Sequence, residues 1–138
     1  MSGTTTNTTL DGLLRDFVER VADVQAVAVA STDGMHKHSY GIDDVGDADQ
    51  VSAVSSGLFS LAKGADRLFP GSASMTARQV IVEVGSGLYF VTSPAEGALL
   101  TVLARHEANL GLIGYEMNML GQSIGPSLRT APRTAAAG

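Results

Sequence analysis

The chain has 138 residues, of which 44% are hydrophobic, and it combines a net charge of −5 with a complete lack of cysteine. This length and hydrophobic content predict one folded domain with a core of ordinary size. The acidic balance argues against nucleic acids and anionic membranes as partners, because the scattered Lys and Arg residues form no basic patch. Without cysteine, the chain has no disulfide, no thiolate zinc site and no thiol catalysis.

The N-terminal segment, residues 1–8, is rich in Ser and Thr and lacks a basic region followed by an apolar run. It predicts a disordered leader and no secretion signal, and since no segment is apolar enough to span a membrane, we expect a cytoplasmic protein. With Thr8 or Thr9 as the N-cap, apolar residues at helical spacing predict a first amphipathic helix. They are Leu10, Leu13, Leu14, Phe17, Val18 and Val21.

Two strands joined by a tight turn are predicted next. Residues 24–31 (VQAVAVAS) are rich in Val and Ala without polar alternation, which predicts a strand covered on both faces. Asp33-Gly34 predicts a hairpin turn, since this pair tolerates the positive φ that tight turns need. Residues 35–40 then return as a more polar strand, which we expect at an edge of the sheet.

A long helix is predicted from Asp47 to Phe69, with Asp47 or Asp49 as its N-cap and Pro70-Gly71 as its stop. One apolar face at helical spacing predicts packing on the protein's own core: Val51, Val54, Leu58, Leu61, Ala62, Ala65, Leu68 and Phe69. About 110° around the helix, small residues form a second stripe: Ala53, Gly57, Ser60 and Gly64. Because mid-helix glycine costs about 0.5–1 kcal/mol relative to alanine, we expect this stripe to pack against another helix, most simply that of a second copy.

The second half of the chain predicts three strands and a last helix. The strands are residues 76–84, 88–93 and 99–104, and the third is the most apolar and is expected near the centre. The helix carries Leu110, Ile113, Met117, Leu120 and Ile124 on one face. Residues 126–138 lack apolar periodicity and predict a mobile tail, so the predicted single domain covers residues 9–125.

The order of the predicted elements is α-β-β-α-β-β-β-α, and short turns join the consecutive strands. This order predicts an α/β (α+β) fold whose five-stranded sheet is mainly antiparallel. Three helices, together with inner strands that are apolar on both faces, imply a three-layer sandwich with helices on each side.

Patterns that would indicate catalysis or ligand binding are weak. His36 and His38 would face the same way on a strand and could hold a metal, but no further ligands occur at motif spacing, and the alternative is a polar edge strand. The acidic loop before the long helix lacks the ligand pattern of an EF-hand. No phosphate loop, dinucleotide fingerprint or nucleophile elbow is present. We therefore expect no catalytic residue, no metal and no cofactor.

Phe59 is placed about 120° from the apolar stripe of the long helix, on the side away from the small residues. Together with Ser52, Lys63 and Asp66 it would form a partner-contact patch, in which an aromatic anchor has a polar rim. The alternative is a Phe that a loop or the dimer mate half covers.

Three segments resemble the Roadblock family of small α/β proteins, also called the Roadblock/dynein light-chain fold: VQAVAVASTDG, AVSSGLFSLAKGADRLF and VLARHEANLGLIGYEM. The likeness covers residues 8–125. It looks most like the Roadblock proteins of conservon operons in high-GC Gram-positive bacteria, which also encode a sensor-kinase-like protein and a Ras-like GTPase. The Mgl polarity protein, which acts on its own small GTPase, is a more distant relative.

This resemblance implies that the long middle helix covers one face of the sheet and the two terminal helices cover the other. It also implies a homodimer through the middle helix and the adjacent strand edge. The interface residues would be Ala53, Gly57, Ser60, Gly64, Val80 and Val82. The implied function is a non-enzymatic adaptor or regulator of a Ras-like small GTPase, with a sensor-kinase-like protein as a further candidate partner. Arg67 and Arg78 are the candidates if an Arg must reach the nucleotide.

Two other functions stay open at this point. A small-molecule or signal-sensing domain would need a pocket between sheet and helix, and only three Tyr, four Phe and no Trp are available to line one. A passive scaffold would hold the kinase and the GTPase together without acting on either.

Overall fold

The computed structural model describes residues 2–72 and 76–128. The elements follow in the predicted order: α1 (Ser2–Arg20), β1 (Val24–Ser31), β2 (His36–Tyr40), α2 (Val45–Asp66), β3 (Gln79–Val84), β4 (Gly87–Ala95), β5 (Ala98–Ala104) and α3 (Leu110–Leu128). All five strands form one antiparallel sheet with the spatial order β2-β1-β5-β4-β3. The predicted fold class is therefore confirmed. As expected, β5 lies at the centre and β2 at an edge, while β3 forms the opposite edge.

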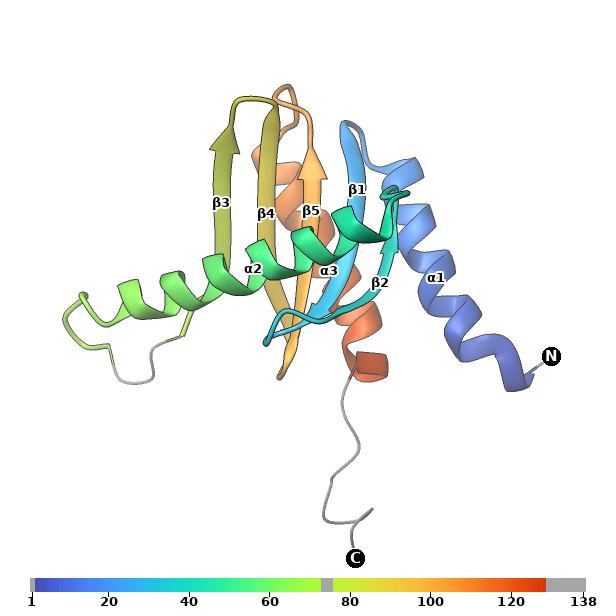
Figure 1. Ribbon diagram of the computed structural model, residues 1–138, viewed down its shortest axis with the longest axis horizontal. Coiled ribbons are helices and arrows are strands. Elements are labelled where there is room, and N and C mark those ends of the chain that lie inside the picture. Colours follow the sequence, from blue (N-terminus) through green and yellow to red (C-terminus); the bar gives the residue numbers. More distant parts are fainter. Residues whose placement is uncertain (1, 73–75, 129–138) are drawn as a thin grey trace, which may run out of the picture.

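The helices lie on both faces of the sheet, and α2 crosses one face while α1 and α3 cover the other (Figure 1). The larger hydrophobic core lies under α1 and α3, and its fully buried side chains include Leu14, Phe17, Phe90, Leu100, Val102, Ile113, Met117 and Ile124. On the α2 face, the buried apolar cluster consists of Phe59, Val91 and Leu99 alone. Because hydrophobic stabilisation scales with the apolar area buried, α1 and α3 are held more strongly on the sheet than α2 is.

Two helix starts differ from the prediction. Helix α1 begins at Ser2, before the expected cap at Thr8 or Thr9. Residues 2–8 have low helix propensity, but they extend a helix whose later turns are packed, so they do not bear the cost of nucleation. Residues 2–8 are thus helical, where a disordered leader was expected. Helix α2 begins at Val45, and its N-cap is Asp44, whose carboxylate accepts a 2.7 Å hydrogen bond from the backbone N–H of Gly46. This carboxylate reaches the free amides of the first turn, so the cap lies before the predicted Asp47 or Asp49.

Two helix ends also differ. Helix α2 ends at Asp66 instead of Phe69. Helix α3 continues to Leu128 and includes Pro126 in its last turn, where the missing N–H removes one hydrogen bond of the helix. The predicted tail therefore starts within this helix, and its remainder, residues 129–138, lies outside the described residues. No helix within the described ranges is long and apolar enough to cross a membrane.

Candidate interaction surface on α2 and the β3 edge

The face of α2 that lies on the sheet is formed by small and polar residues. Ala48, Ser52, Ser55 and Phe59 are its buried residues, and they recur every three or four positions. The prediction that the apolar stripe faces the protein's own core is wrong for five of its members, which are exposed: Val54, Leu61, Ala65, Leu68 and Phe69. Leu61 is 74% exposed whereas Ser55 is fully buried, so the helix is rotated relative to the prediction.

A hydrogen-bond network explains this rotation of α2. The hydroxyl of Ser55 lies 2.6 Å from the hydroxyl of Thr101 on β5 and 2.8 Å from the hydroxyl of Tyr89 on β4. The Tyr89 hydroxyl donates to the backbone carbonyl of Val51 at 2.8 Å. A buried hydroxyl without a partner costs about 1–3 kcal/mol. The sheet therefore favours the helix face that carries Ser55, and no buried side-chain nitrogen or oxygen of the described residues lacks a partner.

Burial raises the pKa of the Tyr89 phenol, and the hydrogen bond with Ser55 opposes this shift. Since the pKa is higher in the folded chain than in the unfolded chain, the folded state binds more protons at alkaline pH. The stability that the neutral phenol contributes is present in full below the ordinary pKa of 10.0 and is lost as the pH rises through the folded value. The hydrogen bonds around Tyr89 that hold α2 on the sheet are therefore expected to weaken at alkaline pH.

Tyr89→Phe is expected to lower the free energy of unfolding by about 1–2 kcal/mol at neutral pH, because Ser55 and the Val51 carbonyl lose a partner. The variant should also lose less stability than the parent when the pH rises above about 10. Urea unfolding at neutral and alkaline pH measures both effects. Tyr115→Phe, at an exposed position, is the matched control and should change neither. An unchanged stability of Tyr89→Phe would contradict the role of the network.

The prediction that Phe59 and Ser52 belong to a partner-contact patch is wrong. Phe59 is 7% exposed and packs against Val91 and Leu99 of the sheet, so the protein's own sheet covers it instead of a loop or a dimer mate. Ser52 is buried and donates a 3.0 Å hydrogen bond to the carbonyl of Ala48. Both residues share the inner face of α2 with Ser55, which explains why they are unavailable to a partner.

The other residues of the predicted patch lie near the C-terminal end of α2. Lys63 and Arg67 are exposed. Asp66 is half-buried, and its carboxylate accepts hydrogen bonds from the Ser72 hydroxyl at 2.8 Å and from the Thr76 backbone N–H at 3.2 Å. Asp66 therefore holds the connection to β3, whereas Lys63 and Arg67 are free to meet a partner.

The outer face of α2 carries the small residues. Ala53, Gly57 and Ser60 are exposed and Gly64 is half-buried. A Cβ atom added at Gly57 or Gly64 would meet nothing within 4 Å, so no part of the described chain requires glycine at either position. At about 100° per residue, the exposed Val54 and Leu61 lie within about 60° of Gly57 on this face. Large apolar side chains thus stand beside a stripe of small ones, and we call this surface the α2 outer face.

The β3 edge lies beside α2, whose C-terminal half reaches past this strand in Figure 1. Among residues 2–72 and 76–128, strand β3 pairs with β4 alone, and no described strand meets the hydrogen-bonding groups on its other side. Val80 and Val82 are half-buried, and Ile81 and Val84 are exposed. Within Gln79–Val84 (QVIVEV) no Lys or Pro protects the edge, unlike β2 with its Lys37. An apolar free edge of this kind is suited to pairing with another strand.

His36 and His38, which were considered as metal ligands, have separate partners. One ring nitrogen of His36 lies 3.1 Å from the Ser39 hydroxyl, and one of His38 lies 3.5 Å from the Asp11 carboxylate. Across the described residues, no three His, Asp or Glu side chains gather in a way that could hold a metal ion. Both histidines therefore serve the polar edge strand.

Sequence reasoning missed two features of this surface. The hydroxyl network of Ser55, Tyr89 and Thr101 had only a weak signal, which was the hydroxyl-bearing Tyr89 and Thr101 within otherwise apolar stretches of β4 and β5. The exposed apolar residues Leu61 and Leu68 had none, because their helical spacing is the same on a buried face and on an interface.

Comparisons with known proteins agree with this fold. The family model described as the Roadblock/LC7 domain matches residues 10–104. The chain is similar to a Roadblock/LC7 domain from Streptomyces avermitilis, with 39% identity, a TM-score of 0.79 and coverage of 87% of this chain and 98% of that one. It shares the fold of the gliding protein MglB from Thermus thermophilus, with 12% identity, a TM-score of 0.71 and coverage of 88% and 89%. MglB from Myxococcus xanthus has 17% identity, a TM-score of 0.69 and coverage of 90% and 94%. No curated protein matches the sequence.

Proposed function

The chain belongs to the Roadblock/LC7 domain family, and on this basis we propose that it is a non-enzymatic homodimeric regulator of a cognate Ras-like small GTPase in the cytoplasm. The observation that carries the proposal is the uncovered surface formed by the α2 outer face and the β3 edge. Large exposed apolar residues on such a continuous surface mark an interaction site.

In the proposed dimer, the α2 outer faces of two copies pack against each other. Gly57 and Gly64 let the helix backbones approach closely, and Leu61 of one copy then fills the space beside the small residues of the other. Ala53 and Ser60 complete the small stripe. Such packing would remove from water the apolar side chains that the protein's own chain leaves exposed.

The β3 edges of the two copies would pair at the same time. Antiparallel pairing would satisfy the free hydrogen-bonding groups of each β3 strand and would join the two sheets into one. Val80 and Val82 point to the α2 side of the sheet, where Val80 packs against the Phe59 cluster, so pairing would complete their burial. The helix pair and the strand pair thus support one two-fold arrangement.

The GTPase would dock beside the C-terminal ends of the paired α2 helices, where Lys63 and Arg67 offer exposed positive charge. The protein would favour one nucleotide state only to the extent that it binds that state more tightly than the other. Arg67 and Arg78 are both exposed, and the isolated protomer gives no geometric preference between an inserted Arg and a rearrangement of the GTPase's own groups. A sensor-kinase-like protein is the second proposed partner.

The test is a pull-down of the candidate GTPase, loaded with GDP or with a non-hydrolysable GTP analogue, on the immobilised protein. State-selective capture supports a regulator. Equal capture of both states would contradict regulation and favour a passive scaffold, which should then also retain the sensor-kinase-like protein. No capture of either state would overturn the proposal.

The double variant Lys63→Ala, Arg67→Ala is expected to weaken GTPase capture by about two- to tenfold, and the difference should shrink at high salt. Its dimer mass should stay unchanged, because neither residue belongs to the small stripe. Arg15→Ala together with Arg105→Ala removes the same charge at exposed sites on α1 and after β5, and it should leave capture intact. Equal capture by both double variants would remove Lys63 and Arg67 from the site.

A further inference from the structure

A cavity of about 390 Å³ lies between the sheet and α3, on the face opposite α2. Neighbouring strands of a sheet lie about 4.8 Å apart, so two helices that are each about 10 Å wide cannot cover the full width of a five-stranded sheet. Helix α1 contacts β1 and β2, and helix α3 contacts β4 and β5, but the backbone of neither helix comes close to the backbone of β3. The cavity therefore occupies the part of this face that the chain's own helices leave bare.

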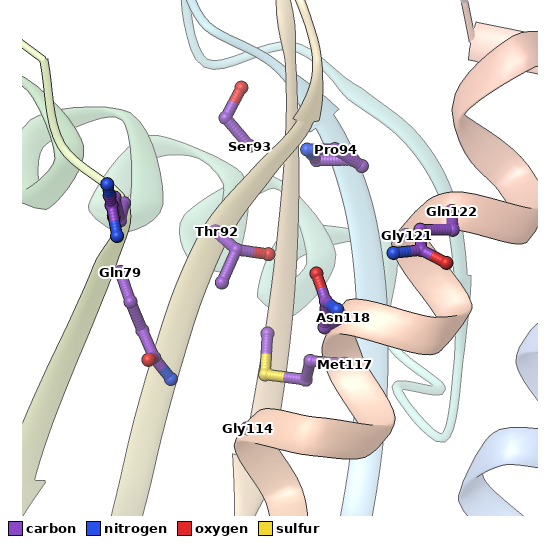
Figure 2. A pocket seen from close by; sticks show the side chains of 10 residues that line it. Gln79, Thr92, Ser93, Pro94, Gly114, Met117, Asn118, Gly121 and Gln122 are labelled. Atoms are coloured by element: carbon purple, nitrogen blue, oxygen red, sulfur yellow. The ribbon is translucent and has the colours of Figure 1, made fainter.

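Polar side chains from two elements face each other across the cavity (Figure 2). Gln79 of β3 stands on one side, Asn118 and Gln122 of α3 stand on the other, and Thr92 and Met117 lie between them. The cavity volume lies within the range of about 300–1,000 Å³ that is typical of small-molecule sites. The amide groups supply both donors and acceptors, and no aromatic side chain contributes to the lining.

The backbone around the cavity keeps it open. The pairing register of β4 with β5 shifts between Thr92 and Ala95, and this bulge lies at the cavity wall. On α3, a Cβ added at Gly114 would lie 3.5 Å from the Gln79 side-chain nitrogen, so a large side chain there would enter the cavity. Bulges of this kind often re-aim side chains beside a binding site.

The charge of the lining points to the ligand. Arg78 is its one charged residue, and the lining contains no carboxylate, although the whole chain has a net charge of −5. A guanidinium group binds carboxylates with two parallel hydrogen bonds. We propose that this cavity binds a small polar carboxylic acid, with its carboxylate at Arg78 and its hydroxyl, carbonyl or amide groups at Asn118 and Gln122. The bound acid would bridge β3 and α3.

The test uses N-acetyl-L-alanine, with N-acetyl-L-alaninamide as the uncharged probe of the same shape. Nuclear magnetic resonance follows the side-chain amide signals of Gln79, Asn118 and Gln122 in the isotope-labelled full chain. We expect saturable shifts of these signals with the acid, and binding that is at least about tenfold weaker with the amide. Arg78→Gln should weaken binding of the acid to the same extent, whereas Arg105→Gln, at an exposed site outside the lining, should not.

Gly114→Leu provides an independent variant, because its side chain should fill the cavity. It should abolish the shifts while the signals of the remaining chain stay those of a folded protein. Absence of shifts at all three amides in the parent protein would overturn the proposal. Equal binding of the acid and the amide, or unchanged binding by Arg78→Gln, would overturn the carboxylate assignment. These binding measurements use no GTPase, so their outcome is separate from that of the GTPase pull-down.

Discussion

Gly57→Leu is expected to convert the dimer into a folded monomer or an aggregate. The protomer itself has room for the new side chain, since nothing lies within 4 Å of a Cβ at this position. In the dimer, the same side chain would hold the two α2 backbones apart and would expose the apolar residues around it. Light scattering should report the mass of one 14.2 kDa chain or large particles, whereas the proposed dimer of the parent is expected to show twice that mass. Gly64→Leu should behave in the same way.

Gly12→Leu is the matched control for this experiment. Gly12 lies on α1, and a Cβ there also meets nothing within 4 Å. The control makes the same change of residue in another helix, and we expect it to remain a dimer. A dimer of unchanged stability in Gly57→Leu would show that the small stripe on α2 is not the contact between copies.

Phe59→Ala is expected to destabilise the protein by about 3–5 kcal/mol, because it removes the one large buried side chain that α2 places on the sheet. Only Val91 and Leu99 share its buried cluster, and neither lies on α2. Leu58 of α2 also packs against this cluster but is only partly buried, so the helix replaces little of the lost contact. Urea unfolding followed by circular dichroism measures the change. GTPase capture should fall only as far as the folded fraction falls.

The control for this measurement is Phe69→Ala, the same change at an exposed position. Both variants are best compared in the Gly57→Leu background, which removes the contribution of the dimer to stability. There Phe69→Ala should change the free energy of unfolding by less than about 0.5 kcal/mol. Similar losses in both variants would contradict the assignment of Phe59 as the anchor of α2.

The orientation of α2 shows where periodicity alone misleads. Its sequence holds one stripe of large apolar residues and one of small residues, and the large stripe resembles an ordinary buried face. In the structure, Tyr89 and Thr101 place hydroxyl groups under the helix, and Ser55 is the residue that can satisfy them. Apolar spacing cannot predict which face turns inward when the sheet beneath also carries buried hydroxyl groups.

The candidate dimer surface was predictable in part for the same reason. Mid-helix glycines have a cost that packing must offset, so Gly57 and Gly64 indicated a contact face without any structure. The β3 strand could be recognised from its apolar sequence. The prediction assigned Leu61, Leu68 and Phe69 to the core and Phe59 to the surface. These assignments were wrong because the rotation and the end of one helix were not predictable from apolar spacing.

Local sequence determined the element order and the antiparallel sheet, since apolar periodicity, short turns and the Pro70-Gly71 stop act over a few residues. It also placed β5 at the centre, because a strand with two apolar faces needs cover on both sides. Only the tertiary structure decided which side of α2 is buried. It also decided that neither α1 nor α3 covers the face of β3 opposite α2. The first outcome depends on hydroxyl groups from α2, β4 and β5 that come together only in the folded chain. The second depends on the width of two helices relative to that of a five-stranded sheet.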